Sequence, residues 1–163
     1  GGTIGLLAAQ TARAWGAGRV VVREPSQRRR SIAQALRLDP AEPDDDVEPA
    51  HIVIECSGNA RAARQALDAT EKGGTTVIVG VHNEPVSIDL QRFVLTERSV
   101  VASLSHTMQE DYAPAAALLA AGEVDVEPIV TDTVALSDVV SEGFTALLEE
   151  PDDHIKVLVR CAA

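Results

Sequence analysis

The order of apolar and polar positions divides the chain into alternating short strands and helices. Five short apolar runs bounded by turn residues have the pattern of buried parallel strands. They are RVVVRE at 19–24, HIVIEC at 51–56, TTVIVGV at 75–81, SVVASLS at 99–105 and HIKVLVR at 154–160. Helices are predicted between them at 3–15, 26–38, 59–74, 89–98, 109–122 and 137–150. The alternation predicts an α/β fold with a parallel sheet and helices on both of its faces.

Two details of this pattern can be compared directly with a structure. In the first helix, Ile4, Leu7, Ala8, Thr11 and Trp15 lie close to one helical face, which is therefore expected to be the buried one. The segment DPAEPDDDVEPA at 39–50 contains three prolines and six acidic residues, and this composition predicts a solvated loop.

Composition narrows the classes of partner. A net charge of −11 and an aromatic content of 2% argue against nucleic acid, whose binding needs clustered basic residues or stacking aromatic rings. No apolar run approaches the roughly 18 residues of a membrane-spanning helix. Two cysteines without metal-type spacing fit free thiols in a reducing cytoplasm.

The opening GGTIG suggests a phosphate-binding turn. Gly2 and Gly5 have the spacing of the last two glycines of G-x-G-x-x-G, and the first glycine is expected one residue before Gly1. In that motif the glycines let the backbone approach a pyrophosphate, which lies at the N-terminus of the following helix. Two glycines alone fit a plain turn equally well.

The second predicted strand adds a residue for the adenosine ribose. Glu24 stands 19 residues after Gly5, close to the roughly 20 expected for an acid that accepts both ribose hydroxyls. A carboxylate there repels a 2′-phosphate and favours NAD. Arg28, Arg29 and Arg30 leave NADP as the alternative, because an arginine at this place could hold that phosphate. Small residues at later strand ends, Ser57-Gly58, Gly80 and Ser103 to Ser105, are expected to line one crevice.

With these features the chain resembles the cofactor-binding half of the medium-chain, zinc-dependent alcohol dehydrogenases, and most of all the sorbitol, butanediol and threonine dehydrogenases. The segments that carry the resemblance are GGTIGLLAAQTARAWGA, VVVREPSQRRR, VIECSGN, GGTTVIVGV, SVVASLS, LLAAGEVDVEPIVTDTVALSDVVSEGF and HIKVLV. It implies one Rossmann-type NAD(P)-binding domain over 1–163, a doubly wound parallel sheet lacking its first strand and shortened around the third. It also implies that residues from about 106 to 163 pack partly on a catalytic domain.

The resemblance implies contacts with the phosphates of a nicotinamide dinucleotide. It places Gly2, Thr3 and Ile4 at the pyrophosphate, with Gly5 as the packing glycine of the helix. It places Lys156 near the same phosphates.

Further positions follow for the two ends of the dinucleotide. Glu24 is implied at the ribose, Pro25 along the adenine, Arg29 near the ribose and Ser57 near the adenine. Two positions are implied beside the nicotinamide carboxamide, Val81 and Ser103.

By the same resemblance, the activity would be hydride transfer between a secondary alcohol and NAD, assisted by zinc. The family's zinc ligands precede the glycine motif, so we predict no metal site and no catalytic residue in this chain, and we expect the chain alone to be inactive. The alternative is a non-catalytic module for dinucleotide binding or dimerisation. The edge strand at 99–105 is expected to pair two copies into a homodimer.

Overall fold

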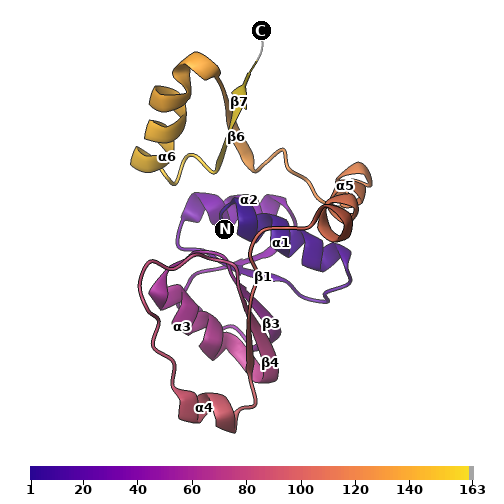
Figure 1. Ribbon diagram of the computed structural model, residues 1–163, viewed down its shortest axis with the longest axis vertical. Helices are drawn as coiled ribbons and strands as arrows, with labels where there is room; N and C mark the ends of the chain where they lie inside the picture. The colour runs from indigo at the N-terminus through magenta and orange to yellow at the C-terminus, as the bar shows by residue number, and fades with distance from the viewer. Residues whose placement is uncertain (162–163) are drawn as a thin grey trace. The chain divides into compact units, whose positions relative to one another are not determined.

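The computed structural model describes residues 1–161, which form two compact units (Figure 1). The first unit comprises residues 1–42 and the chain from Pro114 onward, and the second comprises Pro43–Ala113. All strand pairs in both units are parallel, which confirms the predicted α/β class. Within residues 1–161, no helix has the length and hydropathy needed to cross a membrane.

The first unit contains two strand pairs and most of the helices. Its N-terminal part holds α1 (Thr3–Ala14), β1 (Val21–Arg23), α2 (Gln27–Ala35) and β2 (Asp39–Ala41), with β1 parallel to β2. Its later part holds α5 (Ala113–Ala120), β6 (Val130–Ala135), the short helices η2 (Leu136–Asp138) and η3 (Val139–Phe144), α6 (Thr145–Glu149) and β7 (Lys156–Arg160). Strand β6 pairs with β7.

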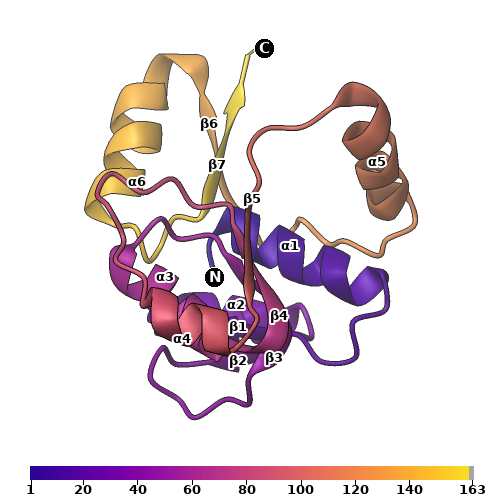
Figure 2. The same ribbon diagram turned by 60° about the horizontal axis from the view of Figure 1, so that its bottom comes forward.

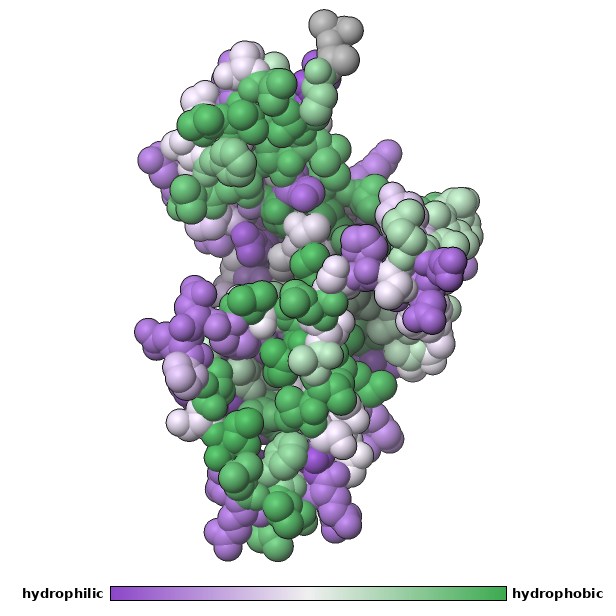
Figure 3. Space-filling view, in the orientation of Figure 1, coloured by the Kyte–Doolittle hydropathy of each residue, from purple (hydrophilic) through white to green (hydrophobic). Residues whose placement is uncertain are grey.

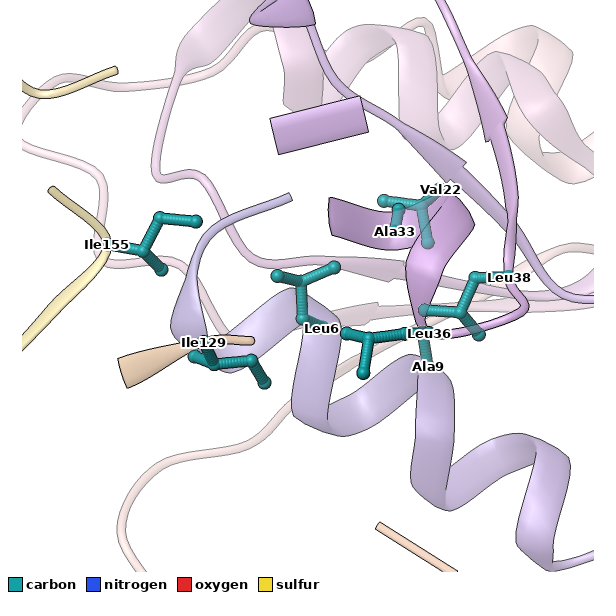
Figure 4. Packing of buried hydrophobic residues seen from close by; sticks show 8 residues of the cluster. All are labelled: Leu6, Ala9, Val22, Ala33, Leu36, Leu38, Ile129 and Ile155. Carbon is teal, nitrogen blue, oxygen red and sulfur yellow. The ribbon is translucent and has the colours of Figure 1, made fainter. Parts of the chain in front are cut away.

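The core of the first unit forms where α1 meets β1 and α2 (Figure 4). Leu6 of α1 and Ala33 of α2 are completely buried. Ile129 and Ile155 join the same cluster, so side chains far apart in the sequence close one core. The remaining members of the cluster are Ala9, Val22, Leu36 and Leu38.

The buried face of α1 differs from the predicted one. The structure buries Leu6, Ala9 and Gln10, whereas Ile4 and Trp15 are 54% and 72% exposed. Gln10 is buried because its side-chain amide is satisfied: its Nε2 donates to the Asp125 carbonyl oxygen at 3.0 Å, and its Oε1 accepts from the Asp125 N–H at 2.8 Å. A pattern based on hydrophobicity alone cannot anticipate such a polar core position.

The second unit is a three-stranded parallel sheet in the order β3-β4-β5 (Figure 2). Its elements are β3 (Ala50–Glu55), α3 (Ala60–Ala69), β4 (Thr70–Ile78), α4 (Leu90–Leu95), β5 (Ser99–Ala102) and η1 (Met108–Tyr112). The Asn59 side chain caps α3 by accepting from the Arg61 and Ala62 N–H groups. Glu55 pairs with Ile78 and Ile78 with Ala102, so the three strands end in register. Strand β5 lies at the edge of this sheet, as predicted for 99–105.

Three sequence-based assignments need correction. The expected loop 39–50 begins with strand β2, because Leu38 and Ala41 are buried and Pro40, which lacks an N–H, is tolerated in a strand paired on one side only. Strand β6 was missed because three consecutive polar residues, Thr131, Asp132 and Thr133, interrupt its apolar positions. The helix predicted to reach residue 74 ends at Ala69, where Thr70 starts β4 directly.

The strands of the described residues form three separate parallel sheets rather than the single expected one. The pairs β1-β2 and β6-β7 belong to the first unit, and β3-β4-β5 makes up the second. Each group nevertheless keeps the parallel pairing that an alternating strand–helix order produces.

Apolar side chains are exposed in both units (Figure 3). Over η3 and α6, Val140, Phe144 and Leu148 are 67%, 61% and 80% exposed. Over α4 of the second unit, Leu90, Val94 and Leu95 are about equally exposed. Exposure of this kind is typical of surfaces that another domain or chain covers. The expectation that residues from about 106 to 163 pack on a catalytic domain stays a prediction.

Truncating the most deeply buried leucine tests the core of the first unit. We expect Leu6→Ala to lower the free energy of unfolding by about 2–5 kcal/mol, because it removes buried methyl groups and leaves a cavity. The matched control Leu148→Ala, at a highly exposed position, is expected to change it by less than about 0.5 kcal/mol. Chemical denaturation followed by circular dichroism measures both values. Equal losses for the two variants would contradict the assignment of the core.

Candidate functional site

The glycine turn at the start of the chain leads into an uncapped helix. Gly2 is the N-cap of α1 and provides no side chain to cap it. The Leu6 N–H donates to the Gly2 carbonyl oxygen at 3.0 Å, which makes the first helical hydrogen bond. The preceding N–H groups of the helix have no intrahelical acceptor, and together with the helix dipole they favour an anion at this end.

Glu24 lies against this turn. Its carboxylate is buried; Oε1 accepts a hydrogen bond from the Ser26 N–H at 2.9 Å, and Oε2 lies 2.9 Å from the Gly1 amino nitrogen. A Cβ on Gly1 would stand 2.6 Å from Glu24 Cγ, so this close approach requires glycine at position 1. The structure therefore brings together the glycine turn and the acid that the sequence places at the ribose. It also adds Gly1, which the sequence motif treats as a variable position.

Arg29 reaches the same turn from α2. Its Nη1 would lie 3.8 Å from a Cβ on Gly2, its Nη2 donates to the Pro151 carbonyl oxygen, and its Nε is buried without a hydrogen-bond partner among residues 1–161. The neighbouring Arg28 pairs with Asp153, and Arg30 pairs with Glu42 at 2.8 Å. Arg29 is thus the member of this basic run whose guanidinium lies near the glycines.

The other predicted contacts of the first unit are placed as follows. The Thr3 hydroxyl donates to the Ile155 carbonyl oxygen at 3.1 Å, which brings the segment just before Lys156 to the start of α1. Lys156 itself is exposed and is the first residue of β7. Pro25 is exposed after β1, and Ile4 and Gly5 lie in the first turns of α1.

In the second unit the predicted residues follow the three strand ends. Ser57 comes after β3, Val81 after β4 and Ser103 after β5. The Ser103 N–H donates to the Ile78 carbonyl oxygen at 2.9 Å, and all three side chains are exposed. The three residues therefore follow neighbouring parallel strands at the same end of this sheet, and the expectation that they line one crevice stays a prediction.

Two residues at this edge did not attract attention in the sequence. Glu55, the last residue of β3, is buried, and its carboxylate accepts from the Ser57 and Gly58 N–H groups. His82 Nε2 lies 3.1 Å from Glu55 Oε2. A charged residue closing the apolar run HIVIE is the signal that could have identified Glu55.

The described residues contain no group of three or more His, Cys, Asp or Glu side chains that could hold a metal ion. Cys56 and Cys161 are both free thiols. Burial raises the pKa of the Cys56 thiol, and the neighbouring Glu55 carboxylate raises it further, so this thiol is a weak nucleophile.

One titratable pair lies beside the start of β7. His154 Nδ1 is 2.7 Å from Asp132 Oδ2, and His154 Nε2 is 3.6 Å from Glu150 Oε2. The hydrogen bond that His154 donates to the Asp132 carboxylate holds the pKa of His154 above its ordinary value. The same bond, with help from the Thr131 hydroxyl, holds the pKa of Asp132 below its ordinary value.

Comparison with known protein families identifies the chain. The sequence profile described as "Zinc-binding dehydrogenase" matches residues 3–121. The chain belongs to the zinc-binding dehydrogenase family. This confirms the resemblance stated from the sequence.

Individual members of the zinc-binding dehydrogenase family agree in sequence and in fold. The chain is 31% identical to (R,R)-butanediol dehydrogenase of Bacillus subtilis (strain 168), over 98% of this chain and 48% of that protein. The crystal structure of 2R,3R-butanediol dehydrogenase from Bacillus subtilis matches 99% of this chain and 49% of that one, with a TM-score of 0.88 and 28% identity.

A further match is a putative zinc-binding dehydrogenase from Sinorhizobium meliloti 1021 bound to NADP, with a TM-score of 0.86 and 26% identity. It covers 99% of this chain and 50% of that one. These matches confirm a dehydrogenase cofactor-binding fold of the Rossmann type. The chain spans about half the length of the relatives it matches.

The pair His154–Asp132 gives a pH-dependent test. We expect Asp132→Asn to lower the pKa of His154 toward about 6.5, its ordinary value. Glu150→Gln, the matched control, is expected to lower it less, because Glu150 is the more distant partner. NMR titration of the His154 imidazole measures both shifts.

The sign of the stability effect follows from the two pKa directions. The contribution of His154, whose pKa is raised, is complete below about pH 6.5 and is lost as the pH rises through its folded pKa. The contribution of Asp132, whose pKa is lowered, is complete above about pH 4 and is lost as the pH falls through its folded pKa. Asp132→Asn should therefore destabilise the chain most between about pH 4 and pH 6.5. A loss of stability that grows above pH 8 would argue against this pair.

Proposed function

We propose that the chain is the NAD(P)-binding part of a zinc-type alcohol or polyol dehydrogenase, which transfers hydride between a secondary alcohol and a nicotinamide cofactor. The observation that carries the proposal is the buried Glu24 carboxylate held against the glycine turn. Family membership and similarity to butanediol dehydrogenases support the same reaction class.

The residues of the first unit fit the adenosine diphosphate part of a dinucleotide. The uncapped N-terminus of α1 at Gly2, with Thr3 and Ile4 in its first turn, offers N–H groups to the pyrophosphate. Arg29 places its Nη1 beside that turn, so a phosphate there would gain a charge-assisted hydrogen bond. In this proposal Glu24 accepts the ribose hydroxyls, Pro25 lies along the adenine, Gly5 packs the helix and Lys156 adds charge near the phosphates.

Three positions of the second unit are proposed for the ends of the cofactor. Ser57 would lie near the adenine, and Val81 and Ser103 beside the nicotinamide carboxamide. All three are exposed at the carboxyl ends of parallel strands, where ligands bind in open α/β sheets.

NAD is the proposed cofactor, although the relative from Sinorhizobium meliloti was solved with NADP. A 2′-phosphate would meet the Glu24 carboxylate, and two ionised groups in a partly buried site repel each other strongly. Arg28 and Arg30, which could compensate, are paired with Asp153 and Glu42.

When bound, the nicotinamide supplies the hydride chemistry, and the residues of this chain bind and orient it. The positions that the resemblance gives to zinc ligands precede the glycine motif, and the described residues have no metal-type cluster. We therefore propose that the 163-residue chain alone does not turn over a simple diol with NAD. A non-catalytic dinucleotide-binding or dimerisation module is the second candidate, and a cytoplasmic location stays a prediction.

We also propose a homodimer formed through β5. This strand pairs only with β4 among the described strands, and all four of its residues are exposed. Because the Ser103 N–H donates to Ile78, strand alternation turns the N–H of Ala102 to the open edge. An open edge with apolar Val100 and Val101 is suited to pairing with a second copy.

Titration with NADH tests cofactor binding. We expect NADH to bind the 163-residue chain, and Glu24→Ala to raise its Kd about tenfold or more, since hydrogen bonds to a carboxylate contribute about 1.5–3 kcal/mol. The same variant should reduce the difference in affinity between NADH and NADPH, because the carboxylate that repels the 2′-phosphate is gone. Glu123→Gln, at an exposed carboxylate after α5, is the control and should leave both affinities unchanged. Unaltered NADH affinity in Glu24→Ala would refute the assigned role of Glu24.

Light scattering tests the dimer. We expect the chain to be dimeric, and Ala102→Pro to shift it toward monomer, because proline removes an edge N–H without breaking the bonds between β4 and β5. Ala102→Val keeps that N–H and should stay dimeric. A wild-type chain that remains monomeric at high concentration counts against the proposal.

A further inference from the structure

The buried carboxylate of Glu55 receives hydrogen bonds from two separate turns of the second unit. From the turn after β3, the Ser57 N–H donates at 2.7 Å and the Gly58 N–H at 3.1 Å, and the Ser57 hydroxyl donates to the same Oε1. From the turn after β4, His82 Nε2 lies 3.1 Å from Oε2. The side chain of Glu55 is only 2% exposed, so these donors replace the water that the carboxylate loses on folding.

Two glycines allow the turns to come this close. Gly58 has a φ of +68°, and a Cβ there would stand 2.5 Å from the Val81 carbonyl oxygen. A Cβ on Gly80 would overlap Glu55 Oε2 and the Gly58 nitrogen. The Val79 and Gly80 N–H groups also donate to the Glu55 carbonyl oxygen, at 2.9 and 3.0 Å. Both the backbone and the side chain of Glu55 therefore hold the turn that carries Val81.

The imidazole of His82 is suited to be a donor to Glu55. Its side chain is 13% exposed, and its Nδ1 is buried without a hydrogen-bond partner among residues 1–161. The tautomer that carries its proton on Nε2 donates to the carboxylate and has no N–H on Nδ1.

We infer that Glu55 and His82 are positioning residues for the dinucleotide, with Glu55 fixing Ser57 and His82 coupling Val81 to the same carboxylate. The inference rests on the proposed function, in which Ser57 lies near the adenine and Val81 beside the nicotinamide carboxamide. Neither Glu55 nor His82 is required to touch the cofactor. They act by fixing the geometry of the two turns that do.

The arrangement predicts that the two ends of the cofactor respond differently to substitution. Removing the His82 imidazole takes away the side-chain anchor of the turn that carries Val81, which keeps only its backbone bonds to Glu55, and it leaves the three donors of the Ser57–Gly58 turn in place. Replacing Glu55 disturbs both turns. ADP-ribose contains the adenine but no nicotinamide, so its affinity depends only on the Ser57–Gly58 turn.

The experiment compares the affinities of NADH and ADP-ribose for the 163-residue chain by isothermal titration calorimetry. We expect His82→Ala to lower the affinity for NADH about tenfold, as for loss of one hydrogen bond to a charged group. The affinity for ADP-ribose should change less than about twofold. Glu55→Gln should lower the affinity for both ligands, because the new NH₂ group is itself a donor and faces some of the donors that meet the carboxylate. His51→Ala, an exposed histidine of the same unit, is the control and should change neither affinity.

Two amide variants separate positioning from general stability. The Nε2 of glutamine can occupy the place of His82 Nε2, whereas the shorter asparagine cannot reach it. We expect His82→Gln to restore NADH affinity to within about threefold of the wild type, and His82→Asn to behave like His82→Ala. Thermal unfolding of each variant, measured in parallel, identifies any that fails to fold.

The outcomes distinguish this inference from the proposed function. If the wild-type chain binds neither NADH nor ADP-ribose, both the proposed function and this inference are refuted. If the wild type binds NADH and His82→Ala binds it equally well, only the inference is overturned. Equal weakening of both ligands by His82→Ala, or no rescue by His82→Gln, would show a purely structural role and also overturn it.

Discussion

An ionised carboxylate that leaves water must find hydrogen-bond donors, or its burial costs several kcal/mol. This constraint acts at the ends of two strands: Glu24 directly follows β1, and Glu55 is the last residue of β3. Each carboxylate accepts from the N–H two residues later, that of Ser26 at 2.9 Å and that of Ser57 at 2.7 Å. The same short sequence, Glu-x-Ser, thus folds the chain back at the carboxyl end of a parallel strand in both units. The turns that follow carry Pro25 and Ser57, two of the residues proposed for the cofactor.

The glycines near these carboxylates follow from the same constraint. Glu24 restricts position 1 to glycine, and Glu55 does the same at position 80, because a Cβ at either position would overlap the acidic side chain. The sequence shows these glycines only as parts of a motif or as strand ends. The structure gives them a steric reason, since a buried carboxylate reaches its donors only if the neighbouring backbone has no side chain.

Sequence reasoning succeeded where a signal was local and periodic. The short apolar runs ending at Glu24 and Glu55 predicted parallel strands, which β1 and β3 confirm. The spacing from Gly5 to Glu24 singled out an acid that the structure places beside Gly1, and its role at the ribose stays a prediction. It failed where tertiary partners decide burial. Gln10 is in the core because Asp125, distant in the sequence, satisfies its amide. Strand β6 lacks the continuous apolar run of the other strands, because residues 131–133 are all polar. His82 could not be assigned a role, because its partner Glu55 lies 27 positions away.

The two carboxylates also differ in a way that bears on their roles. The donors that meet Glu55 come from the turns of its own unit and satisfy both carboxylate oxygens, so this group is suited to holding protein rather than ligand. Glu24 is different: Oε1 is engaged by Ser26, while Oε2 faces the glycine turn, where a ribose hydroxyl would arrive in the proposed complex. Glu24 and Glu55 therefore have the same local backbone setting but differ in the group that contacts their Oε2 atoms. The His82 side chain makes Glu55 a positioning group, whereas Glu24 Oε2 meets the Gly1 amino nitrogen of the half-buried glycine turn, where the ribose hydroxyls would approach in the proposed complex.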